Sequence, residues 1–289
     1  MAAKQTSASR DLQAAQYKTS FGRIAAIKGS EPQGKPLLVL LHSLGTSKRL
    51  YAEVIPELSD EFQCIAIDAL GHGDSDRPPF EFTIPDHATA VIELIEQLRR
   101  SDQPVFVAGC SFGAILSMEI AARAPDIVSA ILVNGSPGWH LESQRLARLH
   151  SVTSLMVGED GLPYPDMEGG GTVVPASDEE RAARRQDVQK SGRYLLSTMW
   201  AMAAHDLIPR LSRIRATTTI LMGDKDWHCA TSYTLSDGIE GAVLEFVEGA
   251  GHLTPYDAPA EVAAAIRRLH TRFRATERRA DRNAAARIS

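Results

Sequence analysis

The sequence predicts an α/β fold in which a mostly parallel central sheet is flanked by helices. Short runs at 36–41, 62–67 and 105–108, apolar apart from Gln63, have the composition of strands that are buried on both faces of a sheet. Stretches with helical periodicity separate these runs, and such alternation is typical of parallel sheets because each parallel crossover needs a long connection. Residues 137–205 have no strand pattern, so we expect a helical lid or cap inserted there.

The expected domain organisation follows from these patterns. Residues 16–136 and 206–275 form the α/β core, and 137–205 form the helical lid or cap insertion. Residues 1–15 are polar and are expected to be disordered, and the Arg- and Ala-rich residues 276–289 are expected to form a frayed helical tail. Neither terminal segment has an apolar stripe that could be buried.

The elements before the insertion are predicted from composition and caps. Thr83 and Asp86 have the spacing of a capping box, which begins a helix. The apolar residues of that helix recur on one face at helical spacing. Gly29 to Gly34 is a cluster of turn residues. Strands are expected at 17–20, 21–28, 36–41, 62–67, 105–108 and 129–133, and further helices at 48–58 and from Ala114.

The later elements are predicted in the same way. Residues 157–177 contain three glycines in a row and three prolines, so we expect a loop. Ser177 and Glu180 have capping-box spacing and begin a charged helix to about Lys190. Also expected are a helix at 194–207, strands at 217–222 and 242–247, and a final helix after Asp257 that buries Val262, Ile266, Leu269 and Phe273.

Composition limits the class of protein. The chain has 289 residues, is 44% hydrophobic and can bury a substantial core. A net charge of −5 argues against a nucleic-acid surface, and three scattered cysteines argue against a disulfide framework or a metal site. No apolar run is long enough to span a membrane, and the polar start does not resemble a signal peptide. We expect a cytoplasmic protein with a small-molecule substrate, no nucleic-acid or membrane partner and no cofactor; whether it forms a homo-oligomer stays open.

A serine stands at a strand–helix junction. The segment Gly109-Cys-Ser-Phe-Gly113 follows the apolar run 105–108 and precedes a helix. In this strand–turn–helix context, Gly-x-Ser-x-Gly indicates a nucleophilic serine. Glycine is needed on both sides because the turn is tight. Ser111 is therefore a candidate nucleophile.

A serine nucleophile needs a histidine to accept its proton and a carboxylate to orient that histidine. Asp226 follows the strand at 217–222, and His252 follows the strand at 242–247. Both positions lie at the carboxyl ends of strands, where open α/β sheets place their sites. An oxyanion hole also needs two backbone N–H groups, for which we expect Phe112 and Leu44.

Five motifs in register resemble the α/β-hydrolase superfamily: Leu-His-Ser-Leu-Gly at 41–45, Asp-Ala-Leu-Gly-His-Gly-Asp-Ser at 68–75, Gly-Cys-Ser-Phe-Gly at 109–113, Gly-Asp-Lys-Asp at 223–226, and Gly-His at 251–252. The resemblance covers about Phe21 to Phe273 apart from the insertion. It implies the α/β-hydrolase fold and a catalytic triad, with Ser111 as nucleophile, His252 as general base and Asp226 as orienting acid. Asp224 falls two residues too early for the family pattern, so we expect it and the 68–75 turn to be structural.

The oxyanion loop departs from many members of the superfamily, which carry His-Gly where this chain has His42-Ser43. A serine there is unfavourable if the position requires a positive φ. The string Ser-Leu-Gly-Thr is similar to the loop of 3-oxoadipate enol-lactonases, which resembles Asn-Ser-Leu-Gly-Thr. That similarity favours the hydrolysis of a lactone or a small ester.

Other reactions of the superfamily remain as alternatives. Haloalkane dehalogenases and epoxide hydrolases use an aspartate nucleophile, so Ser111 disfavours both. Carbon–carbon hydrolases of vinylogous diketones use a serine, but their oxyanion loop resembles His-Gly-x-Gly-Pro-Gly, which differs from this chain. Acyltransferase or perhydrolase activity is not distinguished by motif. A small-ligand receptor with slow turnover is disfavoured by the intact triad.

The substrate pocket is predicted only coarsely. We expect His42, Trp139, Met199, Trp200 and Leu253 to contact substrate, although Met and Trp at helical spacing also fit packing of a lid on the sheet. No Arg or Lys stands beside a motif as an anchor for a carboxylate except Lys225, which we expect to face solvent. The predicted substrate is an uncharged, moderately apolar ester or lactone.

Overall fold

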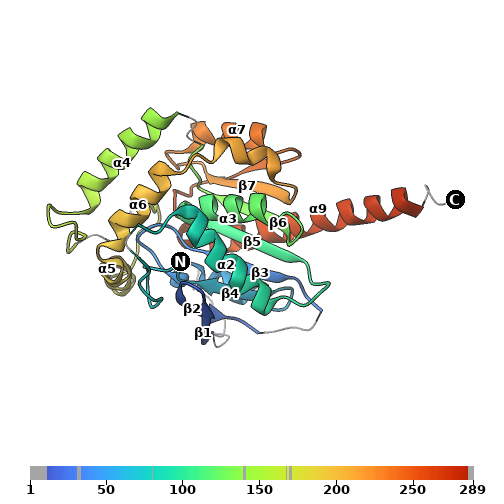
Figure 1. Cartoon of the computed structure of the whole chain (residues 1–289), viewed down its shortest axis with the longest axis horizontal. Helices are drawn as coiled ribbons and strands as arrows, with labels where there is room; N and C mark the ends of the chain where they lie inside the picture. The colour runs from blue at the N-terminus through green and yellow to red at the C-terminus, as the bar shows by residue number, and fades with distance from the viewer. Residues whose placement is uncertain are drawn as a thin grey trace, which may run out of the picture.

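The structure is a computed structural model that describes residues 12–30, 34–79, 81–138, 141–166, 168 and 171–285. These residues form an eight-stranded sheet with the strand order β1-β2-β4-β3-β5-β6-β7-β8. Helices cover both faces of the sheet (Figure 1). From β4 to β8 all neighbouring strands are parallel, and β1 and β2 are antiparallel at one edge. The predicted fold class is therefore confirmed. The strands are β1 (Gln13–Thr19), β2 (Gly22–Lys28), β3 (Leu37–Leu41), β4 (Gln63–Ile67), β5 (Val105–Cys110), β6 (Val128–Asn134), β7 (Thr217–Gly223) and β8 (Val243–Val247).

The central strands are apolar because the sheet is buried on both faces. In β3, Leu37, Val39 and Leu41 pack into one core cluster, and Leu38 and Leu40 pack into the other. Successive side chains of a strand point to opposite faces, so a strand between two helical layers needs an apolar residue at every position. This requirement explains why composition located these strands correctly.

Two groups of helices sandwich the sheet. α2 (Ile84–Leu98), α3 (Phe112–Arg123) and α7 (Cys229–Gly238) pack on one face, and α1 (Val54–Leu58) and α9 (Pro259–Ala285) pack on the other. A 3-10 turn η1 (Lys48–Tyr51) precedes α1, so the helix expected at 48–58 is divided. Pro56 is compatible with the first turn of a helix but not with its interior, which is why α1 begins close before it.

Three further helices lie between β6 and β7, and we call them together the α4–α6 region. They are α4 (Glu142–Met156), α5 (Asp178–Ser191) and α6 (Tyr194–Ala204). The capping boxes predicted for α2 and α5 are both present. α6 ends earlier than expected, and a 3-10 turn η2 (Ile208–Arg213) follows, because Pro209 cannot continue the helix.

The start of the described chain differs from expectation, and its end is helical. β1 begins at Gln13, inside the segment 1–15 expected to be disordered, and residues 1–11 lie outside the described residues. α9 continues to Ala285, so the described part of the segment 276–289, for which we expect a frayed helical tail, is the end of this helix, which projects from the body (Figure 1).

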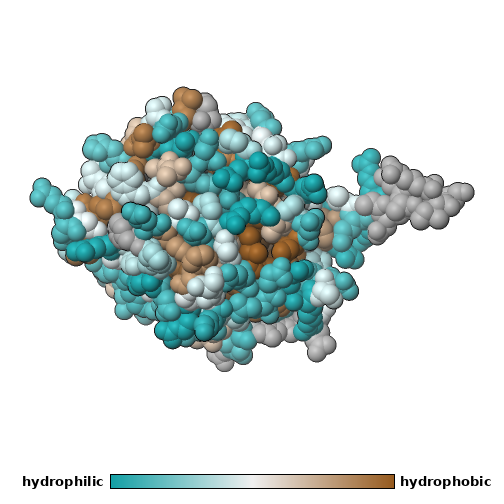
Figure 2. Space-filling view, in the orientation of Figure 1, coloured by the Kyte–Doolittle hydropathy of each residue, from teal (hydrophilic) through white to brown (hydrophobic). Residues whose placement is uncertain are grey.

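The face shown in Figure 2 is mostly hydrophilic, with hydrophobic side chains in small groups. Some of these groups lie over the α4–α6 region, where Leu146, Leu155 and Trp200 are exposed. Among the helices of the described residues, none is both long and apolar enough to cross a lipid bilayer.

Candidate active site

Ser111 lies at the tight turn between β5 and α3, with φ 55° and ψ −109°. Among the described residues it is the one non-glycine residue with a positive φ. Its N–H donates to the carbonyl of Asn134 at the end of β6 (2.8 Å). A Cβ on Gly109 would collide with the carbonyl of Gly113, and one on Gly113 would collide with that of Leu41. The turn therefore has the geometry that the Gly-x-Ser-x-Gly spacing predicts, with no room for a side chain at either glycine.

Asp226 and His252 meet at the same edge of the sheet. His252 Nδ1 lies 3.0 Å from Asp226 Oδ2, and both side chains are almost fully buried. The other Asp226 oxygen accepts the N–H of His228 at 2.8 Å, so the carboxylate is held at both oxygens. Gly135 leaves space for the pair, since a Cβ there would lie 3.1 Å from Asp226 Oδ2. This arrangement favours the His252 tautomer that carries its proton on Nδ1.

Asp224 has a different environment from Asp226. Its carboxylate accepts the N–H of Gly249 at 2.7 Å and pairs with Lys225 at 2.9 Å. The Lys225 side chain is 60% exposed. Asp224 therefore joins the loops that follow β7 and β8 but does not contact the imidazole through these bonds, which fits the structural role expected from its position.

The two candidate oxyanion donors come from adjacent loops. The N–H of Gly113 donates to the carbonyl of His42 at 3.1 Å, which joins the loop after β3 to the start of α3. Within the described part of the chain, neither the Leu44 nor the Phe112 N–H donates a hydrogen bond to another group. Main-chain donors without an internal acceptor are what an oxyanion hole requires. Leu44 and Phe112 therefore stay the predicted pair.

His42 occupies a different place from the one expected. It is 1% exposed, its Nδ1 lies 2.7 Å from the carbonyl of Ser43, and its Nε2 accepts the N–H of Ala69 at 3.0 Å. With both ring nitrogens bonded to the main chain, the imidazole ties two loops together and is not placed to bind substrate. Ser43 has no positive φ, so the serine at this position carries no backbone strain.

Three buried histidines surround the ring of Phe112 behind the elbow, and we call His42, His72 and His87 the histidine cluster. The ring centroids of His72 and His87 lie 5.8 Å and 5.3 Å from that of Phe112, and His42 lies 5.2 Å from His72. Burial lowers the pKa of His42, lowers the pKa of His72 well below its usual value, and lowers the pKa of His87 to about 3. The cluster is therefore neutral near pH 7, and it supports the residue whose amide is a candidate oxyanion donor.

The other residues expected to contact substrate are scattered. Met199 is 4% exposed and packs with Leu149 against Leu44 of the oxyanion loop. Leu253 is 1% exposed and belongs to the core covered by α9, because the chain turns inward immediately after His252. Leu253 is therefore a core residue, contrary to expectation. Trp139 lies outside the described residues.

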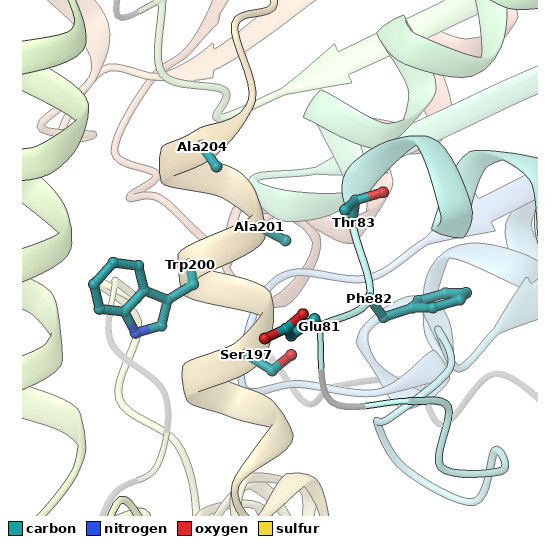
Figure 3. Close-up of a pocket in the computed structure, with 7 residues that line it drawn as sticks. All are labelled: Glu81, Phe82, Thr83, Ser197, Trp200, Ala201 and Ala204. Carbon is teal, nitrogen blue, oxygen red and sulfur yellow. The ribbon is translucent and has the colours of Figure 1, made fainter.

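Trp200 lines a hollow beside α6. The hollow has a volume of about 370 Å³ and lies between α6 and residues 81–83 (Figure 3). Trp200 is 55% exposed, and the candidate triad residues are absent from the described lining of this hollow. Trp200 therefore lies apart from the candidate triad. The lining consists of Glu81, Phe82, Thr83, Ser197, Trp200, Ala201 and Ala204.

Trp227 and His228 adjoin the candidate base, and the motifs did not single them out. The Trp227 ring stacks on that of His252, with centroids 4.6 Å apart and an interplanar angle of 27°. The Trp227 indole N–H donates to His228 Nε2 at 2.9 Å. The one sequence signal for this contact is an aromatic residue directly after the predicted acid, which by itself does not reveal what it will stack on.

Charged contacts seat the α4–α6 region beside the oxyanion loop. The Lys48 ammonium lies 2.6 Å from Asp68 and 2.7 Å from Asp74, and Lys190 of α5 lies 2.6 Å from the other Asp74 oxygen. Burial alone would lower the pKa of Lys48, but the hydrogen bonds to the two carboxylates outweigh it and raise that pKa. Hydrogen bonds from Lys190 and Lys48 lower the pKa of Asp74 to about 2. The 68–75 turn thus connects Lys48 to Lys190 of α5 through its carboxylates, which is a structural role, as the resemblance implies.

The comparisons with known proteins agree with this architecture. A model of the alpha/beta hydrolase family matches residues 38–265, which is most of the chain. The chain belongs to the α/β-hydrolase family. Among its relatives, haloalkane dehalogenase 2 of Mycobacterium tuberculosis is 28% identical to this α/β hydrolase over 86% of this chain and 92% of that protein. A proline iminopeptidase of Pestalotiopsis fici is 25% identical over 76% of this chain and 86% of that protein.

Solved structures share the fold of this α/β hydrolase. The enol-lactonase of Burkholderia xenovorans superposes with a TM-score of 0.71 over 89% of this chain and 100% of its own, at 20% sequence identity. At that identity the likeness shows the fold alone. Because the relatives include a dehalogenase and a peptidase, family membership establishes a hydrolase but does not establish which bond it cleaves.

Proposed function

We propose that this α/β hydrolase cleaves an uncharged, moderately apolar ester or lactone through an acyl-enzyme on Ser111. The observation that carries the proposal is the backbone of Ser111, with φ 55° and ψ −109° at the β5–α3 turn. A non-glycine residue in this region is strained, and such strain persists where the surrounding structure holds a functional group in place. Here the turn presents a hydroxyl at the sheet edge where a bonded Asp–His pair also lies.

The reaction proceeds in two halves. In acylation, the Ser111 hydroxyl attacks the carbonyl carbon and His252 takes its proton; the proton then goes to the leaving alcohol as the tetrahedral intermediate collapses. In deacylation, His252 takes a proton from water, which attacks the acyl carbonyl, and returns that proton to Ser111. Asp226 holds the imidazole in the correct tautomer throughout. The amides of Leu44 and Phe112 bind the oxyanion at both stages, and one such donor contributes about 3 kcal/mol to the transition state.

The chemistry of the nucleophile separates this chain from its dehalogenase relatives. Displacement of a halide by the Ser111 hydroxyl would give an alkyl ether, in which water has no carbonyl carbon to attack. A carboxylate nucleophile gives an ester instead, which a second hydrolytic step can release. Ser111 therefore favours acyl transfer over dehalogenation for this chain.

The preference for an uncharged substrate rests on the ion pairs that nearby lysine and arginine side chains make with carboxylates of the protein. Lys48 is held by Asp68 and Asp74, and Arg49 lies 2.6 Å from the nearly buried carboxylate of Asp187. Cations committed to carboxylates are poor anchors for an anionic substrate. The α4–α6 region also packs apolar side chains against Leu44, which favours an apolar acyl group beside the predicted oxyanion hole.

Two measurements test the proposal. A fluorophosphonate probe should label the wild-type protein at Ser111, as located by peptide mass spectrometry, and should not label Ser111→Ala. Turnover of p-nitrophenyl esters and simple lactones should likewise be lost in Ser111→Ala, while its circular dichroism spectrum stays native.

The substrate screen separates the alternatives. It should include vinylogous diketones, alcohol and peroxide acceptors, and dicarboxylate esters. A higher kcat/KM on diketones would assign a carbon–carbon hydrolase, and acyl transfer to added acceptors would assign a transferase or perhydrolase. Binding without repeated turnover would identify a receptor. Dicarboxylate esters as the best substrates would overturn the preference for uncharged ones.

A further inference from the structure

Part of the connection between α4 and α5 lies directly on the loop that carries His252. We call residues 171–174 the strap. The Leu253 N–H donates to the carbonyl of Gly171 at 3.0 Å. A Cβ on Gly171 would lie 2.6 Å from the His252 Cβ and 2.9 Å from the end of the Trp227 indole. The strap backbone therefore approaches the candidate base so closely that only glycine fits there.

One carboxylate joins the strap to that loop. Asp257, at the end of α8 (Thr254–Asp257), accepts the N–H of Val173 at 3.0 Å and that of Val174 at 2.9 Å. The same carboxylate accepts the N–H of Gly251, the residue before His252, at 2.8 Å. Three main-chain donors from two distant parts of the chain thus converge on a single side chain. Hydrogen bonds to an ionised acceptor are among the stronger ones in proteins.

Three groups bound the imidazole of His252, and one of them belongs to the strap. Asp226 holds Nδ1, the Trp227 ring lies on one face, and Gly171 of the strap packs against the Cβ and the ring carbon next to it. If the strap lifts, the packing that limits rotation of the imidazole is lost, although the hydrogen bond to Asp226 persists. A small error in the orientation of a general base is costly because proton transfer requires close alignment.

We propose that Asp257 is a positioning residue for the reaction: its carboxylate fastens the strap onto the His252 loop and so holds the imidazole in its working orientation. This inference rests on the proposed function, because it assumes that His252 is the general base. It also links the α4–α6 region to catalysis, since the strap belongs to the segment between α4 and α5.

The test compares three variants. Asp257→Asn keeps the size of the side chain but presents an NH₂ group to donors that need an acceptor, and Asp257→Glu retains the carboxylate. The matched control is Asp224→Asn, because Asp224 also accepts a main-chain N–H from the loop after β8 but has no bond to the strap. Circular dichroism and thermal melting establish that each variant is folded.

The first readout does not depend on activity. Hydrogen–deuterium exchange, followed by mass spectrometry on peptides that contain Val173 and Val174, should be at least about tenfold faster in Asp257→Asn than in wild type. It should be unchanged in Asp224→Asn and intermediate in Asp257→Glu. If exchange of the strap amides is the same in Asp257→Asn as in wild type, the anchoring role is wrong.

The second readout is catalytic. In Asp257→Asn, kcat for a p-nitrophenyl ester and the rate of fluorophosphonate labelling of Ser111 should fall about 10- to 100-fold, with KM changed by less than about threefold. Asp257→Glu should recover part of the loss, and Asp224→Asn should retain the wild-type rate. Faster strap exchange with an unchanged kcat would overturn the link to His252.

Two further outcomes are also decisive. If wild-type protein is not labelled at Ser111, the proposed function fails, and the positioning role fails with it, whatever the exchange shows. If Asp257→Asn does not fold, Gly171→Ala approaches the junction from the strap side by placing a methyl group against His252. That variant should show the same selective loss of kcat, and an unchanged kcat would refute the proposal.

Discussion

Replacing His87 with leucine should make the stability of this hydrolase less sensitive to acid. His87 is 3% exposed and packs against the rings of Phe82 and Phe112. Burial lowers its pKa from 6.5 to about 3. The unfolded state therefore binds the proton first, so stability is present above pH 6.5 and is lost as the pH falls from there toward 3. Below pH 6.5, uptake of this one proton by the unfolded state lowers the free energy of unfolding by about 1.4 kcal/mol per pH unit. His87 alone should therefore lower the free energy of unfolding by about 2 kcal/mol between pH 7 and pH 5.

Urea denaturation at the two pH values measures this difference. Between pH 7 and pH 5, His87→Leu should lose about 2 kcal/mol less of its free energy of unfolding than wild type does. Leucine is close to histidine in volume, so the cost of the substitution at pH 7 should stay below about 1.5 kcal/mol. The control is His150→Leu on α4, because His150 is exposed. Between pH 7 and pH 5 this variant should lose as much of its free energy of unfolding as wild type does. An equal acid-induced loss in His87→Leu and wild type would refute the inference that His87 is buried in its neutral form.

Three other predictions test the site and its supports. Asp226→Asn should lower kcat about 10³- to 10⁴-fold through loss of tautomer control, while Asp224→Asn should change it by less than about threefold; the reverse result would overturn the assignment of the acid. Gly135→Ala would place a methyl group 3.1 Å from Asp226 Oδ2 and should lower kcat at least about tenfold, and a wild-type kcat would show that the pair does not need this space. Lys48→Met removes the ammonium partner of the fully buried Asp68 carboxylate and should lower the free energy of unfolding by about 3 kcal/mol, as urea denaturation would measure; a loss under about 1 kcal/mol would contradict a supporting role for this pair.

Much of the fold was predictable because its signals are local. The apolar run at 36–41 became β3, since a strand between two helical layers must be apolar on both faces. The Thr83 and Ser177 capping boxes located the starts of α2 and α5, since a cap needs only residues within one turn. α4 was not predicted as a separate helix, because Leu146 and Leu155 are exposed and the helix has no clear apolar face.

The candidate site was predictable to the extent that it follows from strand ends. Ser111, Asp226 and His252 each follow a parallel strand, and the carboxyl ends of adjacent parallel strands meet at one edge of the sheet. The individual contacts were less predictable. His42 and Leu253 stand beside motif residues in the chain, but a side chain next to a motif can point toward a loop or the core.

The sequence by itself determined the succession of the strands along the chain and the loops that carry the candidate triad, because composition, periodicity and motif spacing act over a few residues. Only the tertiary structure decided what surrounds the base. Trp227 stacks on His252, about 25 residues further along the chain, and Asp257 accepts hydrogen bonds from the strap, whose Val173 lies 84 residues before it. Neither contact leaves a periodic pattern in the sequence, since each depends on where distant backbone amides and rings come to lie.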